Sequence, residues 1–319
     1  MSQKPNAYVH VDMDGLWAIR RCYSLPEGDT LRLDPVWEEG IPQLACWFQQ
    51  LGLPASFFVV GRDLFIRSKQ NQLRTLHQQG FEIANHSHTH KLGITRLSPV
   101  RLVEEIQLAH ELICRCGVPV PTGFRAPGYD VDERVLSTLR TLGYRYDASL
   151  LPTYLTPALR VTDALMARHI NLRKRQFGQL RYAVAPQQPY IPKPESILRA
   201  ANRDTDLTTS NIPPLWEFPV SVITPFRFPL TASAIFALGP QRVCDAIAQH
   251  AAQKKSILLL LHGIDAVDCS QPIIFPNRKP QAGGFNLSLR EKEQMILPVL
   301  KTVLKYFTPV RSCDAIQFM

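Results

Sequence analysis

The segment Phe81-Glu82-Ile83-Ala84-Asn85-His86-Ser87-His88-Thr89-His90 joins an apolar run to three alternating histidines. The apolar run predicts a strand that ends where the histidines begin. His86 and His90 are four residues apart, so on one helical turn both imidazoles would reach a single cation, at ligand distances of about 2.0–2.1 Å. His88 would point elsewhere. The alternative is a histidine-rich polar turn at the surface, and this segment alone leaves that alternative open.

Two carboxylates close a second apolar run, Val9-His10-Val11-Asp12-Met13-Asp14-Gly15. Residues i and i+2 of a strand share a face, so Asp12 and Asp14 are expected to enter one pocket. When two carboxylates lie this near to each other, the pKa of one of them rises unless a cation neutralises them. We therefore expect a divalent metal held by Asp14, His86 and His90, with Asp12 left to act as the base on a metal-activated water. A solvated strand end with an acidic turn is the alternative.

Two more apolar runs end in functional groups, Gly123-Phe124-Arg125-Ala126-Pro127-Gly128-Tyr129 and Leu258-Leu259-Leu260-Leu261-His262-Gly263. Both place a polar side chain at the end of a predicted strand. Taken singly, Arg125 is equally compatible with a surface ion pair and His262 with a structural histidine.

Strands and helices alternate along the chain. The predicted strands are Tyr8 to Asp12, Ser56 to Val60, Phe81 to Asn85, Thr122 to Arg125, Tyr144 to Asp147, Trp216 to Val220 and Ile257 to Leu261. Helix starts are indicated by Asp34-Pro35, by Ser98-Pro99 and by a capping box, Ser288-Leu289-Arg290-Glu291, for a helix toward Phe307. This alternation predicts parallel βα units, in which chemistry collects at the carboxyl ends of the strands.

In chain order, Asp12/Asp14, His86/His90, Arg125-Ala126-Pro127-Gly128 and Leu260-Leu261-His262 resemble the motif series of the polysaccharide deacetylase family, also called the NodB-homology or carbohydrate esterase 4 family. The resemblance spans nearly the whole chain, and the His-Ser-x-x-His element is its most specific part. It implies an α/β fold, a distorted (β/α) barrel of about seven parallel strands. It also implies a metal-dependent amide hydrolase that removes an acetyl group from an N-acetylated sugar.

The chain departs from the usual family pattern in three places. Met13 separates the two aspartates, as in the Asp-x-Asp branch, whose substrates are less uniform and include cyclic amides of purine breakdown. Gly128 stands where an aromatic residue is usual, which keeps the backbone N–H that the resemblance makes the oxyanion donor. The aspartate that orients the catalytic histidine has no clean match. Asp147 and Glu217 both end strand-like runs, and Asp147 is slightly favoured.

The resemblance assigns roles to these residues. Asp14, His86 and His90 would hold the metal and Asp12 would take a proton from water. Arg125 would keep Asp12 ionised and oriented through a charge-assisted pair, and His262 would protonate the leaving amine. Two imidazoles and one carboxylate favour zinc, although cobalt, iron and manganese also fit.

Length and composition agree with one catalytic domain over residues 1–319. No segment approaches the 18 or more apolar residues of a membrane span, and Met1 to Ala7 hold no apolar run, so we expect a cytoplasmic protein. Seven cysteines without a regular framework suit a reducing compartment.

Residues 150–214 are too long for an ordinary connection and predict an insertion that caps the site. Basic residues lie there among aromatic ones: Arg168, Arg173, Lys174, Arg175, Arg181, Phe177, Tyr182 and Tyr190. They favour either an ordinary solvated face or contact with an anionic part of the substrate. The net charge of +9 favours acidic partners without choosing among them.

The sequence also bears on other partners and other functional classes. No nucleic-acid-binding motif is present, so we expect no nucleic-acid partner. The amphipathic stretch Pro225 to Leu238 is more typical of core or loop packing than of a peripheral membrane contact, but both remain open. The number of subunits also stays open, a homo-oligomer included. The alternatives in function are a cyclic-amide hydrolase resembling the allantoinase-like branch, which can work without metal, and a non-catalytic metal- or sugar-binding relative.

Overall fold

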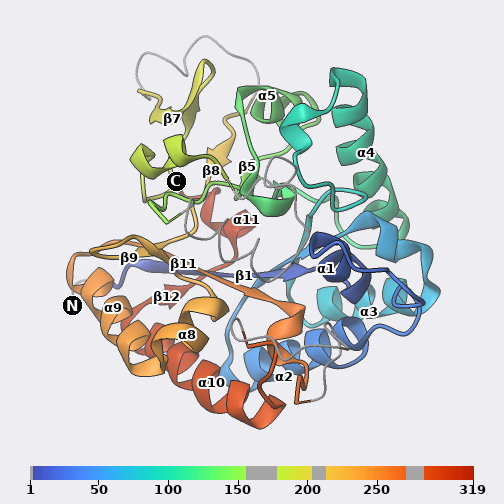
Figure 1. The fold of residues 1–319 in the computed structure, drawn as a ribbon. Coiled ribbons are helices and arrows are strands. Elements are labelled where there is room, and N and C mark those ends of the chain that lie inside the picture. The colour runs from blue at the N-terminus through green and yellow to red at the C-terminus, as the bar shows by residue number, and fades with distance from the viewer. Residues whose placement is uncertain (1–2, 156–177, 203–212, 271–283) are drawn as a thin grey trace.

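Parallel strands form the centre of the molecule (Figure 1). Seven of them pair in the spatial order β11-β1-β2-β3-β4-β5-β8. The computed structural model describes residues 3–155, 178–202, 213–270 and 284–319. The strands are β1 (Asn6–Met13), β2 (Ser56–Val59), β3 (Glu82–Asn85), β4 (Gly123–Phe124), β5 (Tyr146–Asp147), β8 (Trp216–Glu217) and β11 (Ile257–His262). All seven overlap the strands predicted from the sequence, and the sheet curls into a half-barrel, so the predicted NodB-like distorted barrel is confirmed.

Short strands complete the sheet system. β12 (Thr308–Pro309) pairs with β1 and was not predicted. Two small antiparallel hairpins stand apart from the main sheet, one of β6 (Pro192–Lys193) with β7 (Ser196–Ala200) and one of β9 (Val222–Ile223) with β10 (Phe228–Pro229). The two outer strands of the half-barrel are linked through Ser221, whose N–H donates to the Leu258 carbonyl at 3.2 Å.

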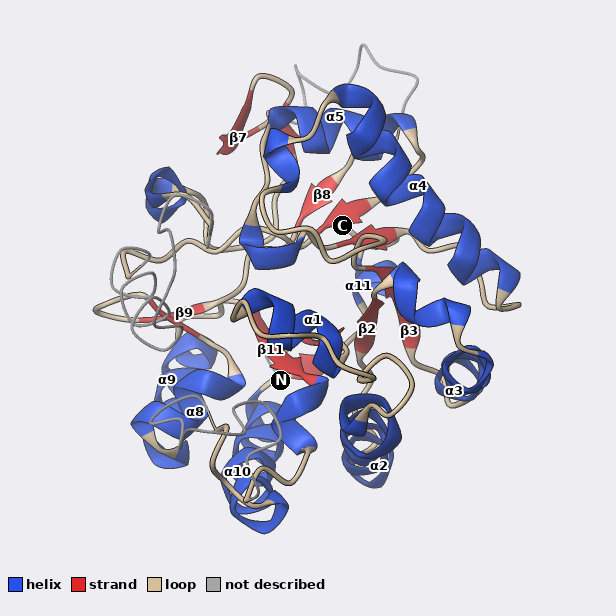
Figure 2. Cartoon of the chain, turned by 45° about the vertical axis from the view of Figure 1, so that its right-hand side comes forward, coloured by secondary structure: helices blue, strands red, loops and turns tan. Residues whose placement is uncertain are grey.

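Helices surround the strands (Figure 2). They are α1 (Leu16–Cys22), α2 (Ile41–Leu51), α3 (Arg67–Gln78), α4 (Pro99–Arg115), α5 (Glu133–Thr141), α8 (Ala232–Leu238), α9 (Pro240–Ala252), α10 (Leu289–Tyr306) and α11 (Ser312–Ala315). Short single-turn helices are η1 (Val36–Gly40), η2 (Gly61–Phe65), η3 (Ile94–Arg96), η4 (Pro127–Tyr129), η5 (Leu180–Val184) and η6 (Gly263–Ala266). No helix among the described residues is long and apolar enough to cross a bilayer.

The predicted helix starts are confirmed. The Ser98 hydroxyl accepts from the Arg101 N–H ahead of α4, and Ser288 and Glu291 form the capping box of α10. Asp34-Pro35 opens a helical stretch as well, but its first turn is the π-helical η1 before α2 begins.

Alternation along β1 divides the core into two layers. Val9, Val11 and Met13 face outward and pack with the surrounding helices, whereas Tyr8 faces the barrel interior with Phe58 and other buried apolar side chains. His10 and Asp12 share the inward face with Tyr8 because each is two residues further along the strand. The interior therefore changes from apolar to polar toward the carboxyl end of β1.

The predicted insertion at 150–214 is described only in part. Residues 156–177 and 203–212 lie outside the described residues, and with them Arg168, Arg173, Lys174, Arg175 and Phe177. Tyr182 and Tyr190 are buried, while Arg181 forms an ion pair with Glu133 at 3.5 Å. The domain division and the cap over the site stay predictions.

Candidate metal centre and active site

The histidine segment is a loop that follows β3. The side chain of Asn85 accepts a hydrogen bond from the Ser87 N–H at 2.8 Å, and Ser87 and His90 have positive φ angles of 65° and 50°. The predicted helical turn is therefore wrong, because the Asn85 side chain and the left-handed residues fold the segment back on itself. His86 and His90 nevertheless face the same point, as the prediction of a shared cation requires.

Three side chains converge at that point. The Nε2 atoms of His86 and His90 each lie 3.2 Å from Oδ1 of Asp14, which follows directly on β1. Asp14, His86 and His90 are buried, and their ligand atoms all lie within 4.8 Å of one another. His88 points away from the group, with its ring 5.8 Å from that of Phe65, as the sequence predicted.

The hydrogen bonding of the three residues fits a bound cation. His86 Nδ1 lies 2.8 Å from the carbonyl oxygen of Arg125, which can only accept, so Nδ1 carries the proton in the neutral ring. Its Nε2 atom then faces a carboxylate oxygen of Asp14 at 3.2 Å, a contact that a proton or a metal ion between the two atoms would stabilise. The donor set consists of two imidazoles and one carboxylate, and a carbonyl fixes the second nitrogen of one imidazole. Such a set suits a divalent metal.

Electrostatics in the group point the same way. Burial disfavours a charged Asp14, but His90 and His86 outweigh it and hold the pKa of Asp14 well below its usual value. Burial likewise disfavours a charged His90, and the Asp14 carboxylate outweighs it and raises the pKa of His90 well above its usual value. The carboxylate is thus held ionised inside the protein by neighbouring positive charge, the condition a metal ion satisfies.

Asp12 lies beside the metal group and is held by Arg125. The guanidinium is fully buried and donates from Nη1 to Asp12 Oδ1 at 2.8 Å and from Nε to the Ala148 carbonyl at 2.8 Å. Oδ2 of Asp12 lies 3.8 Å from Nε2 of His86 and 3.8 Å from Nε2 of His262. One carboxylate oxygen is therefore occupied by Arg125, and the other faces the space between the metal group and His262.

His262 is partnered by Asp265, which the sequence did not predict as a site residue. His262 Nδ1 lies 3.7 Å from Asp265 Oδ2, and the same oxygen accepts the His262 backbone N–H at 2.7 Å. Burial opposes protonation, but Asp265 and then Asp12 raise the pKa of His262 to about 9. The histidine is therefore protonated at neutral pH. The signal in the sequence was the three-residue spacing of His262 and Asp265, which matches a capping box.

Asp147 and Glu217 lie at the ends of β5 and β8 and contact each other rather than His262. The Ser149 hydroxyl donates to Asp147 Oδ1 at 2.6 Å and accepts the Ala126 N–H at 2.7 Å. Burial raises the pKa of Asp147, and burial together with Asp147 raises that of Glu217 well above its usual value. The expected role of Asp147 or Glu217 as orienter of His262 is therefore not supported by their contacts. Asp147 instead supports the loop that follows Arg125.

Gly128 and Tyr129 form a sharp turn beside the centre. Gly128 has φ 67° and ψ 20°, and the φ of Tyr129 is 58°. Glycine takes this left-handed conformation without strain. Burial and the carboxylates of Asp12 and Asp14 raise the pKa of Tyr129, so its phenol is exposed to the negative charge of the site.

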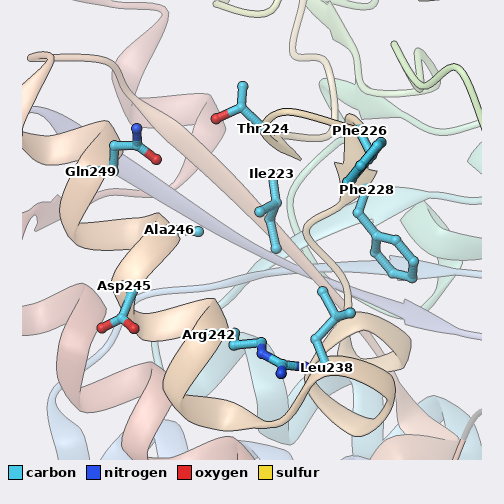
Figure 3. Close-up of a pocket in the computed structure, with 9 residues that line it drawn as sticks. All are labelled: Ile223, Thr224, Phe226, Phe228, Leu238, Arg242, Asp245, Ala246 and Gln249. Carbon is cyan, nitrogen blue, oxygen red and sulfur yellow. The ribbon is translucent and has the colours of Figure 1, made fainter.

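A separate pocket of about 460 Å³ lies between the β9–β10 hairpin and helix α9 (Figure 3). It is lined by Ile223, Thr224, Phe226, Phe228, Leu238, Arg242, Asp245, Ala246 and Gln249. None of the site residues above lines it. The amphipathic stretch from Pro225 to Leu238 forms part of its wall, with Phe226 73% exposed, and a membrane contact there stays a prediction.

Comparison with known proteins gives a consistent family. A family model described as polysaccharide deacetylase matches residues 30–146. The chain is 28% identical over 131 residues to the peptidoglycan deacetylase of Helicobacter pylori, covering 40% of this chain and 43% of that protein. It is 28% identical over 134 residues to the chitooligosaccharide deacetylase of a Bradyrhizobium species, covering 40% of this chain and 59% of that protein. The matched part thus spans about half the length of these curated relatives.

Solved structures match over nearly the whole chain at low identity. A Mycobacterium smegmatis protein assigned to the polysaccharide deacetylases superimposes with a TM-score of 0.61 at 14% identity, covering 99% of this chain and 91% of that one. An allantoinase superimposes with a TM-score of 0.58 at 10% identity, covering 98% and 89%. At such identities the likeness concerns the fold, which both reactions share.

Proposed function

The chain belongs to the polysaccharide deacetylase family, and we propose that it is a metal-dependent hydrolase that removes an acetyl group from an N-acetylated sugar or glycoconjugate. The observation that carries the proposal is the placement of Asp12. Its free oxygen lies 3.8 Å from a nitrogen of the metal group and 3.8 Å from His262, so a base and an acid flank one point.

Asp14, His86 and His90 would hold the metal. When bound, a divalent ion supplies positive charge that polarises the substrate carbonyl and acidifies a water molecule. The donor set favours zinc, with cobalt, iron or manganese as further candidates.

Asp12 and His262 divide the proton transfers. The Oδ2 atom of Asp12 takes a proton from the attacking water while Arg125 holds Oδ1, so the carboxylate cannot turn away. His262 is protonated at neutral pH and gives its proton to the nitrogen of the sugar amide as the carbon–nitrogen bond breaks. The resemblance to the family assigns the oxyanion donor to the Gly128 N–H, and we propose the same role here. The products are acetate and a free amine, and the oxygen added comes from water.

The proposed substrate class is supported by the names of two relatives, a peptidoglycan deacetylase and a chitooligosaccharide deacetylase. We propose a glycan built from N-acetylglucosamine as the first candidate, a location in the cytoplasm, and membership of the Asp-x-Asp branch because Met13 separates the aspartates. An anionic group on the substrate would pair with basic residues of the 150–214 region.

The test is elemental analysis of the purified protein together with acetate release from N-acetylglucosamine oligomers and nucleotide-linked acetamido sugars. We expect about one metal per chain, with metal and acetate release both lost in His86→Ala. The matched control is His88→Ala, two residues away in the same loop but facing Phe65, which should keep its metal.

Two outcomes would redirect the proposal. A metal-free wild-type protein that opens a cyclic amide such as allantoin would identify the allantoinase-like branch as the correct one. A protein that binds metal in the wild type and loses it in His86→Ala, yet hydrolyses neither class of substrate, would be a binding relative.

A further inference from the structure

His10 lies inside the barrel, one inward-facing position before Asp12 on β1. Its Nδ1 atom is 2.6 Å from Nη2 of Arg125, and its Nε2 atom is 2.8 Å from the hydroxyl oxygen of Ser312. His10, Arg125 and Ser312 have no exposed surface. A continuous buried chain therefore runs from α11 through His10 and Arg125 to Asp12.

The protons in this chain can be placed from chemistry alone. A guanidinium group has only donors, so Nδ1 of His10 must accept and carries no proton. The single proton of the neutral ring is then on Nε2, which donates to the hydroxyl of Ser312. Burial, and next the charge of Arg125, lower the pKa of His10 well below its usual value, in agreement with a neutral ring.

Among the residues that the structure describes, the acceptor recorded for Nη2 of Arg125 is Nδ1 of His10. Phe58 lies under the guanidinium, with its ring centre 4.4 Å from the Arg125 Cζ, and its ring is also 4.9 Å from that of His10. Nε and Nη1 are taken by the Ala148 carbonyl and by Asp12. An apolar side chain at position 10 would leave a buried charged donor unpaired beside the proposed base, which is costly and lets the guanidinium rotate.

We infer that His10 is a positioning residue for the proposed base. Its Nδ1 lone pair fixes the second nitrogen of Arg125, so that Nη1 stays on Asp12 Oδ1 and Oδ2 stays turned to the metal group and His262. Ser312, brought into the barrel by the C-terminal helix α11, holds the imidazole in the required tautomer. This inference rests on the proposed hydrolase function for its effect on turnover, but the tautomer can be observed without it.

Two substitutions separate positioning from packing. The amide oxygen of His10→Asn stands close to the place of Nδ1 and can still accept from Arg125, whereas His10→Leu fills the space without an acceptor. We expect His10→Leu to lower kcat by about 10- to 100-fold, the range typical of residues that orient catalytic groups, with KM within about twofold and full metal content. His10→Asn should recover most of that kcat. Equal losses in both variants, or a loss that lies in KM, would overturn the inference.

Nitrogen NMR of labelled wild-type protein tests the same chain without substrate. We expect His10 to show a bare Nδ1 and a protonated, slowly exchanging Nε2 at neutral pH, and Ser312→Ala to speed the exchange of that proton. A charged ring, or a proton on Nδ1, would contradict the inference even if both position-10 variants misfolded. If the wild-type protein turned over no acetylated sugar, the proposed function would fail while this measurement still decided the role of His10.

Discussion

Two buried cations in this molecule are built into opposite kinds of surroundings. Lys69 of α3 lies between two carboxylates, with Nζ 2.7 Å from Asp34 Oδ2 and 2.5 Å from Asp63 Oδ1. Arg125 has one carboxylate, Asp12, and its other partners are a neutral imidazole and a carbonyl. The lysine cluster carries an excess of negative charge, whereas the arginine cluster is balanced.

The use of the carboxylate oxygens explains the difference. Both oxygens of Asp34 make structural contacts: Oδ1 accepts the N–H of Leu16 and Oδ2 accepts from Lys69. The first contact fixes the start of α1 just after Asp14. In Asp12, only Oδ1 accepts from Arg125, and Oδ2 faces the proposed active site. A buried cation with surplus acids thus builds a scaffold, and one with a single acid leaves an oxygen available for proton transfer.

The largest effect is expected from Asp12→Asn. The amide keeps a hydrogen-bond acceptor for Arg125 but cannot take a proton, so kcat should fall by about 10²- to 10⁴-fold. Metal content and melting temperature should stay near those of the wild type. Steady-state kinetics of acetate release, beside elemental analysis, measure both. Activity within a few-fold of the wild type would show that Asp12 is not the base and would remove the contrast with Asp34.

Lys69→Met should act on stability instead. Removing the cation leaves Asp34 and Asp63 unpaired in the interior, which typically costs about 3–5 kcal/mol of unfolding free energy. Urea unfolding gives the value. The control is Arg101→Met, which removes an exposed partner of Glu104 and should cost less than about 1 kcal/mol. Equal, small losses in the two variants would mean that the lysine cluster is not a scaffold.

Asp63→Asn should change how stability depends on pH. Burial raises the pKa of Asp63 to about 6, since it outweighs the nearby Lys69. The folded protein therefore keeps this proton to a higher pH than the unfolded chain does, and the unfolding free energy falls as pH rises from about 4 to about 6, by at most about 1.4 kcal/mol per pH unit. The variant should lack that fall. Unfolding curves across this pH range, compared as wild type minus variant, isolate it; parallel curves would contradict the prediction.

Asp265→Asn should give the smallest change, a shift in the pH dependence of kcat that arises from His262, which lies near the free oxygen of Asp12. Losing this carboxylate lowers the pKa of His262 from about 9, by about one pH unit. Because the protonated ring is the proposed acid, the alkaline limb of the kcat profile should move to lower pH. Asp147→Asn is the matched control and should leave the limb in place. A limb that moves only in Asp147→Asn would restore Asp147 as the orienter.

The sequence predicted the strands and much of the centre because those signals are local. Apolar runs of strand length, proline and serine at helix starts, and motif residues directly after strands all lie within a few neighbouring positions. The parallel half-barrel was therefore predicted correctly. Its strands place Asp14, His86 and His90 together at their carboxyl ends, as expected from the rule for such folds.

What the sequence missed depends on contacts between distant segments or on exact backbone geometry. The histidine loop was predicted as a helical turn because spacing alone does not reveal the Asn85 contact that folds it back. The partner of His262 was sought in Asp147 or Glu217, which both end strand-like runs, with Asp147 slightly favoured. Asp265, three residues after the histidine, was overlooked.

The sequence by itself determined the family, the parallel alternation and the set of groups available for chemistry, because residue types and their spacing are written along the chain. Only the tertiary structure decided which oxygen of Asp12 is free and which acid faces His262. It also decided that Ser312 reaches His10 across 302 residues of sequence. The physical reason is that these assignments depend on hydrogen-bond direction at distances near 3 Å, and the folded barrel, not the order of residues, brings those atoms together.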